Sequence, residues 1–165
     1  MSGLGGLVRP AMRGYLIPLA AGITLMASTF LPWVIIGDTP LKGMPAVPAM
    51  WVAGLGALAA VLATLSIITR RNSRHPLLVI GLAALGIMIL SWRIMPRTAG
   101  DRAHTLSQAF SIVENTPLRE APDALAGSGI YVGLGASAAI VAFGLTIVVK
   151  RASQTYTITS QDDDV

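Results

Sequence analysis

Between two long apolar runs, the stretch SIITRRNSRHPLLV at residues 66–79 carries three arginines and one histidine. The 165-residue chain is 53% hydrophobic and only 12% charged, whereas soluble domains are about 25% charged. Positive charge gathered in a short link between apolar runs is typical of a cytoplasmic loop joining two membrane-spanning helices. The stretch therefore predicts that the chain crosses a membrane both before and after it.

Four runs are apolar enough to cross a bilayer as helices, which takes roughly 20 residues each. They are 15–36, 50–69, 76–92 and 130–149, and none contains Asp, Glu, Lys, Arg or His. The first run is too long for the apolar part of a signal peptide and lacks a small-residue cleavage site, so we interpret it as a retained span. The sequence predicts an all-α, integral membrane four-helix bundle over residues 15–149.

Basic residues are distributed unequally over the segments between these runs. Seven lie in the flank 1–14, the link 70–75 and the tail 150–165, and they are Arg9, Arg13, Arg70, Arg71, Arg74, Lys150 and Arg151. The other five lie in two longer loops, and they are Lys42, Arg93, Arg97, Arg102 and Arg119. This bias predicts cytoplasmic termini, a disordered polar tail at 150–165, and contact of Arg70, Arg71 and Arg74 with anionic lipid.

Aromatic residues mark the opposite side. Trp33, Trp51, Trp92 and Tyr131 each lie at the end of a different apolar run, and all four ends fall on the predicted non-cytoplasmic side. Amphipathic rings favour the lipid headgroup zone, where one edge is wet and the other apolar. We therefore expect these four side chains to be interfacial anchors.

Small residues recur at helical spacing within the runs. Gly129, Gly133 and Ser137 follow one another at intervals of four, and the second run offers Ala53, Ala57 and Ala60 with Gly54 and Gly56 beside them. Membrane helices associate through close backbone approach at such residues, since lipid solvates leucine as well as another helix does. The stripes either pack the spans of one bundle together or dock another subunit, most plausibly through the glycine-rich stripe.

The outer loop, residues 93–129, is the only sizeable polar element. Its segment DRAHTLSQAFSIVEN, residues 101–115, places Ala103, Leu106, Phe110 and Val113 on one face of a predicted helix. Asp101 is the expected N-cap and Asn115 the expected stop, with a second short helix beginning at 116–117. We expect the first helix to lie on the membrane surface or across the outer mouth of the bundle, covering the spans or binding a partner subunit or lipid.

The chemistry of catalysis is missing from the apolar runs. The chain has no cysteine and two histidines, and the runs lack the ionisable groups that intramembrane enzymes and ion-coupled carriers need. His104 in the outer loop has no second histidine or carboxylate cluster near it in the sequence to complete a metal site. We expect no enzymatic activity, no resident cofactor or metal and no nucleic-acid partner, although a bound lipid or pigment is compatible with this composition.

Two stretches resemble a known group of proteins. TFLPWVIIGD at 29–38 and GSGIYVGLGAS at 127–137, with the basic link between them, are similar to small bacterial four-span proteins such as the tryptophan-associated membrane proteins. The resemblance implies a bacterial inner-membrane protein of undefined role, and it supplies no catalytic residues.

Two functions fit these features. The first is a non-catalytic accessory subunit of a larger inner-membrane complex, in a respiratory, photosynthetic or transport assembly, with membrane lipids and other subunits as partners. The alternative is a stand-alone protein that binds an apolar ligand such as lipid, quinone or pigment between the spans.

Overall fold

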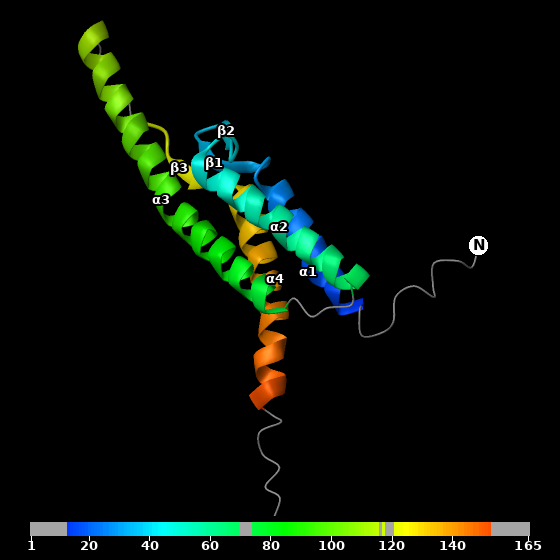
Figure 1. The fold of residues 1–165 in the computed structure, drawn as a ribbon. Helices are drawn as coiled ribbons and strands as arrows, with labels where there is room; N and C mark the ends of the chain where they lie inside the picture. The colour runs from blue at the N-terminus through cyan, green and yellow to red at the C-terminus, as the bar shows by residue number, and fades with distance from the viewer. Residues whose placement is uncertain (1–12, 70–73, 116, 118–120, 153–165) are drawn as a thin grey trace, which may run out of the picture.

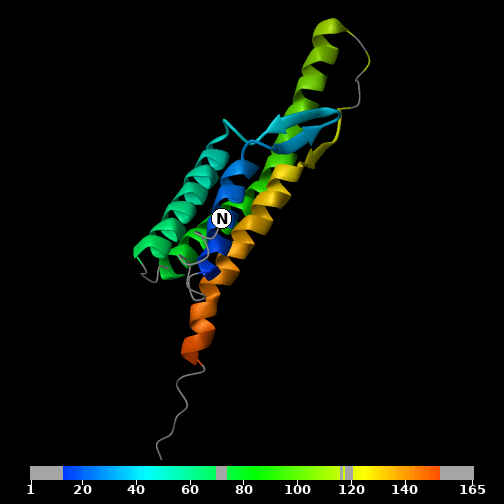
Figure 2. The same cartoon turned by 90° about the vertical axis from the view of Figure 1, so that its right-hand side faces the viewer.

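The computed structural model describes residues 13–69, 74–115, 117 and 121–152, and these residues form four α-helices and a small sheet (Figures 1 and 2). The helices are α1 (Leu16–Ser28), preceded by the 3-10 turn η1 (Arg13–Tyr15), α2 (Val47–Thr69), α3 (Arg74–Glu114) and α4 (Ser128–Ala152). The strands are β1 (Pro32–Ile36), β2 (Thr39–Lys42) and β3 (Ala124–Ala126). Three helices, α2, α3 and α4, contain stretches long and apolar enough to cross a membrane, which confirms a mostly helical, multi-pass class. The all-α prediction is wrong because it missed the sheet.

Three helices carry a proline in the first turn. Pro18, Pro48 and Pro76 are the third, second and third residues of α1, α2 and α3. The first N–H groups of a helix have no intrahelical acceptor, so proline loses no hydrogen bond there, and its fixed φ suits the helix. These prolines explain why the helices begin close to the predicted starts.

The first apolar run does not form one helix. Helix α1 ends at Ser28 after 13 residues, about 20 Å at 1.5 Å per residue, so the predicted span 15–36 is wrong in its second half. Pro32 disfavours helical geometry at the residue before it, and the chain tightens there through a hydrogen bond from the Leu31 N–H to the Ser28 carbonyl at 3.2 Å. The rest of the run becomes strand β1.

The sheet has the order β2-β1-β3, with both pairs antiparallel. A two-residue turn joins β1 to β2, and Gly37 at its first position has φ 56°, a value that suits glycine at this point of a hairpin turn. Strand β3 immediately precedes α4, and the Gly127 N–H donates to the Trp33 carbonyl at 2.8 Å. The sheet thus ties the end of α1 to the start of α4 (Figure 2).

Helix α3 continues far beyond the predicted span 76–92. It runs without a break through Pro96 to Glu114, 41 residues in all, or about 60 Å. Asp101 is therefore inside the helix and is not an N-cap. This part of α3 runs beside β3, where a Cβ on Gly100 would meet the Ala124 side chain at 3.8 Å.

The predicted stop of this helix is confirmed. Asn115 follows the last helical residue with φ 49°, the left-handed conformation that ends many helices and that asparagine tolerates. The second short helix predicted from residue 116 falls largely outside the described residues, as do residues 1–12 and 153–165 of the predicted cytoplasmic flank and tail.

Glycines bring the helix backbones together. A Cβ on Gly22 of α1 would meet the Gly56 carbonyl and the Ala60 nitrogen at 2.8 Å, and one on Gly56 would meet Gly22 and Met26 backbone atoms at 2.8 Å. The small face of α2 runs instead through Ala49, Val52, Gly56, Ala59, Ala63 and Ser66, which are buried. The buried face of α2 thus lies a fraction of a turn away from the predicted stripe of Ala53, Ala57 and Ala60. Gly54, which was expected beside that stripe, is not at a helix contact, since a Cβ there would have nothing within 4 Å.

Candidate functional site

The glycine-rich stripe of α4 is used inside the chain. A Cβ on Gly129 would meet the Trp33 ring at 2.7 Å and the Ser28 carbonyl at 2.8 Å. One on Gly133 would collide with the end of the Met88 side chain of α3, and Ser137 is fully buried with its hydroxyl donating to the Leu134 carbonyl at 3.0 Å. This stripe packs α4 against its neighbours, so it does not offer a free surface for another subunit.

The four aromatic residues expected at the membrane interface divide into two groups. Trp33 is fully buried, and its indole Nε1 donates to the Ser28 carbonyl at 2.9 Å, which also accepts the Leu31 N–H. The side chains of Trp51, Trp92 and Tyr131 are 65%, 45% and 56% exposed. Trp33 therefore belongs to the core, whereas the other three remain available as anchors.

At the start of α3, Arg74 contacts its own bundle. Its guanidinium carbon lies 5.5 Å from the centre of the Phe143 ring of α4, and its Nη1 donates to the Thr146 hydroxyl at 3.4 Å. Phe143 also meets the Tyr15 ring edge-on, with centroids 5.1 Å apart. Arg74 thus contributes to helix packing, while Arg70 and Arg71, its predicted companions in lipid contact, lie outside the described residues.

The last third of α3 forms an arm, residues 101–114, that projects past the sheet (Figure 1). Leu106, Phe110 and Val113 lie within one face of it, since successive residues of a helix turn by about 100°. Their side chains are 58%, 61% and 83% exposed. The arm continues α3 and does not lie across the outer mouth of the bundle, so of the two alternatives for this face, the one in which it covers the spans is wrong.

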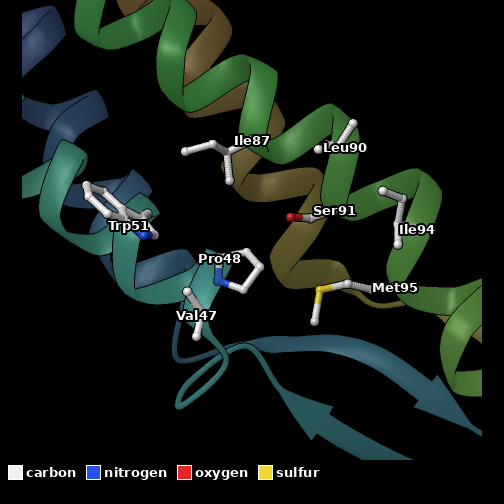
Figure 3. Close-up of a pocket in the computed structure, with 8 residues that line it drawn as sticks. All are labelled: Val47, Pro48, Trp51, Ile87, Leu90, Ser91, Ile94 and Met95. Atoms are coloured by element: carbon white, nitrogen blue, oxygen red, sulfur yellow. The ribbon is translucent and has the colours of Figure 1, made fainter.

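A groove separates the start of α2 from the middle of α3 (Figure 3). It has a volume of about 280 Å³ and an almost wholly apolar wall. Val47, Pro48 and Trp51 contribute from α2, and Ile87, Leu90, Ser91, Ile94 and Met95 from α3. Val47 and Trp51 also border a shallow hollow of about 550 Å³ on the outer side of α2. The sequence prediction missed this groove, because only packing shows which faces of α2 and α3 diverge.

Titratable groups do not gather into a candidate metal site in the described part of the chain. No group of three or more His, Asp or Glu side chains there is arranged to hold a metal ion, and both histidines, His75 and His104, are exposed. The buried hydroxyls that have acceptors in their own helices include those of Ser28, Thr29, Ser66 and Ser137. What the described residues offer is an exposed arm, an apolar groove and a set of interfacial side chains.

Compared with known proteins, the chain matches no protein-family model, no curated protein and no solved structure. The resemblance to small bacterial four-span proteins gains no support from these comparisons. The described residues define a class, a mostly helical protein in which three helices are long and apolar enough to cross a membrane.

Proposed function

We propose that this protein is a non-catalytic accessory subunit of a larger membrane complex, and that it docks to its partner through the arm. The observation that carries the proposal is the exposed apolar face of Leu106, Phe110 and Val113. Contiguous exposed apolar surface on a folded protein marks contact with another protein or a membrane. Aromatic residues such as Phe110 are typical of interface centres.

The position of the arm favours a protein partner over the lipid core. From Trp92 to Glu114, α3 extends 22 residues, about 33 Å, which is as long as the hydrocarbon layer is thick. Arg93, Arg97 and Asp101 interrupt this length, and charged side chains are expensive inside the hydrocarbon layer. The apolar face near the end of the arm therefore stands in water unless another subunit covers it.

The interior of the bundle supports the same assignment. Small residues of the kind that dock membrane helices make contacts within this chain, Gly22 against Gly56 and Gly133 against Met88, although a Cβ on Gly54, Gly86 or Gly135 would have nothing within 4 Å. Docking through the arm leaves that packing intact. If the basic link before α3 and the basic end of α4 lie in the cytoplasm, the arm between α3 and α4 extends on the other side of a bacterial inner membrane. A respiratory, photosynthetic or transport complex with a surface on that side is an admissible host.

Replacing Phe110 by glutamate should release the partner. A charge at the centre of an apolar interface and the loss of an aromatic anchor together weaken binding by about 30-fold or more. After extraction in a mild detergent, wild-type protein should co-migrate with a stoichiometric larger partner in blue-native electrophoresis, and Phe110→Glu should migrate alone.

The matched control is Gln108→Glu. Gln108 is exposed on the same arm, about 160° around the helix from Phe110, so this variant adds the same charge on the opposite side and should keep the partner. Wild-type protein that migrates without any partner, or Phe110→Glu protein that keeps it, would contradict the proposal.

The groove between α2 and α3 favours a second candidate function, binding of an apolar ligand such as a lipid chain, a quinone or a pigment. Its apolar wall offers burial of a hydrocarbon or ring system, and Ser91 faces the opening with a hydroxyl (Figure 3). Ligand sites typically combine such a wall with a few polar groups. In this case the protein acts alone as a carrier of the ligand.

Ile94→Trp should displace a ligand from the groove by filling it. The control is Ile89→Trp on the same helix, because Ile89 is 47% exposed and does not line the groove. Mass spectrometry of the organic extract of purified protein should find one apolar compound per chain in wild type and in Ile89→Trp, and much less in Ile94→Trp. Equal amounts in all three proteins would exclude the groove as its site.

A further inference from the structure

A second cavity lies on the other side of α3, between α3, β3 and the start of α4. Its volume is about 490 Å³. Its wall consists of Trp92, Arg93, Pro96, Arg97, Ala124, Leu125, Ala126 and Tyr131. It differs from the groove of Figure 3 because two arginines are among its lining residues, and no step of the docking proposed above uses it.

The two arginines lack acidic partners in the described part of the chain. Arg93 and Arg97 are one helical turn apart, and neither forms an ion pair with a described Asp or Glu, including Asp101 one turn farther along α3. A guanidinium presents a planar fork of donors that fits a phosphate with two parallel hydrogen bonds. Two such groups on one cavity wall create a site for a phosphate-bearing anion.

One backbone feature adds to the attraction for an anion. Tyr131 belongs to the first turn of α4, which begins at Ser128, and the positive end of a helix dipole lies at its first turn. Strand β3, which pairs only with β1 in the described sheet, presents both N–H donors and C=O acceptors along its outer edge, so it adds polar groups of both signs. The cavity therefore combines the charge of the two arginines with the positive end of α4.

The cavity also lies where the apolar part of the protein ends. Trp92 closes the apolar part of α3 and Tyr131 opens that of α4, both with half-exposed rings. Such rings favour the level of lipid headgroups. The remaining wall residues are alanines, a leucine and a proline, which suit hydrocarbon better than water.

We propose that this cavity binds the phosphate of an anionic phospholipid from the non-cytoplasmic leaflet, with Arg93 and Arg97 holding the phosphate and an acyl chain lying below Trp92 and Tyr131. A free phosphate ion would meet the same two guanidiniums but would leave most of the apolar wall uncovered. The lipid covers both parts of the wall, so it is the occupant that the cavity fits.

The test uses the full chain in nanodiscs that contain equal amounts of phosphatidylglycerol and phosphatidylcholine with identical acyl chains. After transfer to mild detergent, native mass spectrometry counts the lipids retained on each chain. Wild-type protein should retain one phosphatidylglycerol that Arg93→Gln/Arg97→Gln loses. Each charge-assisted contact contributes about 1.5 kcal/mol, about tenfold in affinity, so binding by the double variant should fall by about 100-fold.

Two further measurements make the result specific. Arg102→Gln removes a cation of α3 that does not line the cavity, and it should keep the lipid, as should wild type in millimolar inorganic phosphate. A double variant with unchanged helical circular dichroism that still retains the lipid overturns the proposal. So does loss of the lipid from Arg102→Gln, or its full displacement by inorganic phosphate, which would assign the site to a free anion.

Discussion

Replacing Trp33 by alanine is expected to destabilise the protein by about 3–5 kcal/mol, the usual cost of deleting a buried large aromatic side chain. The indole is fully buried and lies against Gly43 and Gly129, where a Cβ on either glycine would be 2.7 Å from the ring. Its removal leaves a cavity where α1, the sheet and α4 meet. Thermal unfolding in detergent should show a midpoint lowered by about 10 °C.

Two controls separate the contributions of Trp33. Trp33→Phe keeps most of the packing but loses the hydrogen bond to the Ser28 carbonyl, which should cost about 1–2 kcal/mol. Trp51→Ala, at a side chain 65% exposed, should leave the midpoint nearly unchanged. Equal effects of Trp33→Ala and Trp51→Ala would show that Trp33 is an interfacial anchor, as its sequence position suggests.

Replacing Gly56 by leucine should separate α1 from α2. The new Cβ would lie 2.8 Å from the Gly22 carbonyl oxygen and the Met26 nitrogen, and backbone atoms on both sides cannot move as a flexible side chain would. Overpacking usually lowers the free energy of unfolding by about 1–3 kcal/mol. Because the clashes here are with backbone atoms, we expect a loss of about 3 kcal/mol or more for this variant. Thermal unfolding in detergent should record a midpoint lowered by several degrees or more.

Gly54→Leu is the matched control on the same helix. A Cβ at Gly54 would meet nothing within 4 Å, and leucine favours helix over glycine by roughly 0.8 kcal/mol. This variant should unfold at the wild-type temperature or slightly above it. If both variants unfold alike, the close approach of α1 and α2 at Gly22 and Gly56 is absent in the protein.

The failures of the sequence prediction have specific physical causes. Hydropathy detects an apolar run, but it does not distinguish helix from strand, so the run through Trp33 was assigned wholly to one span. Two tertiary interactions favour the strand over the helix here. The Trp33 indole donates to the Ser28 carbonyl, and β1 pairs with β3, which lies some 90 residues later in the chain. Pro32 is the one local signal against a continuous helix, because proline disfavours helical geometry at the residue before it.

The candidate surfaces show the same limit. The small residues of α4 and the apolar residues of the arm were identified correctly as faces, because helical spacing is a local property. Which of them is covered depends on neighbours from other parts of the chain: Met88 and Trp33 cover Gly133 and Gly129, whereas Phe110 has no such cover. The glycine-rich stripe of α4, which the sequence favours as a docking surface, is thus part of the core, whereas the apolar face of the arm is exposed.

The sequence by itself predicted a mostly helical chain with membrane-spanning runs, the approximate starts of α1, α2, α3 and α4, and a helix stop at Asn115. Local hydropathy indicates the spanning runs, prolines in first turns indicate the helix starts, and Asn115, which tolerates a left-handed φ, indicates the helix stop. Only the tertiary structure decided that α1 stops short at Ser28, that α3 continues through Pro96, and that Arg93 and Arg97 share a cavity with β3 and Tyr131. Those outcomes depend on contacts between residues far apart in the chain, whose energies no local window of sequence contains.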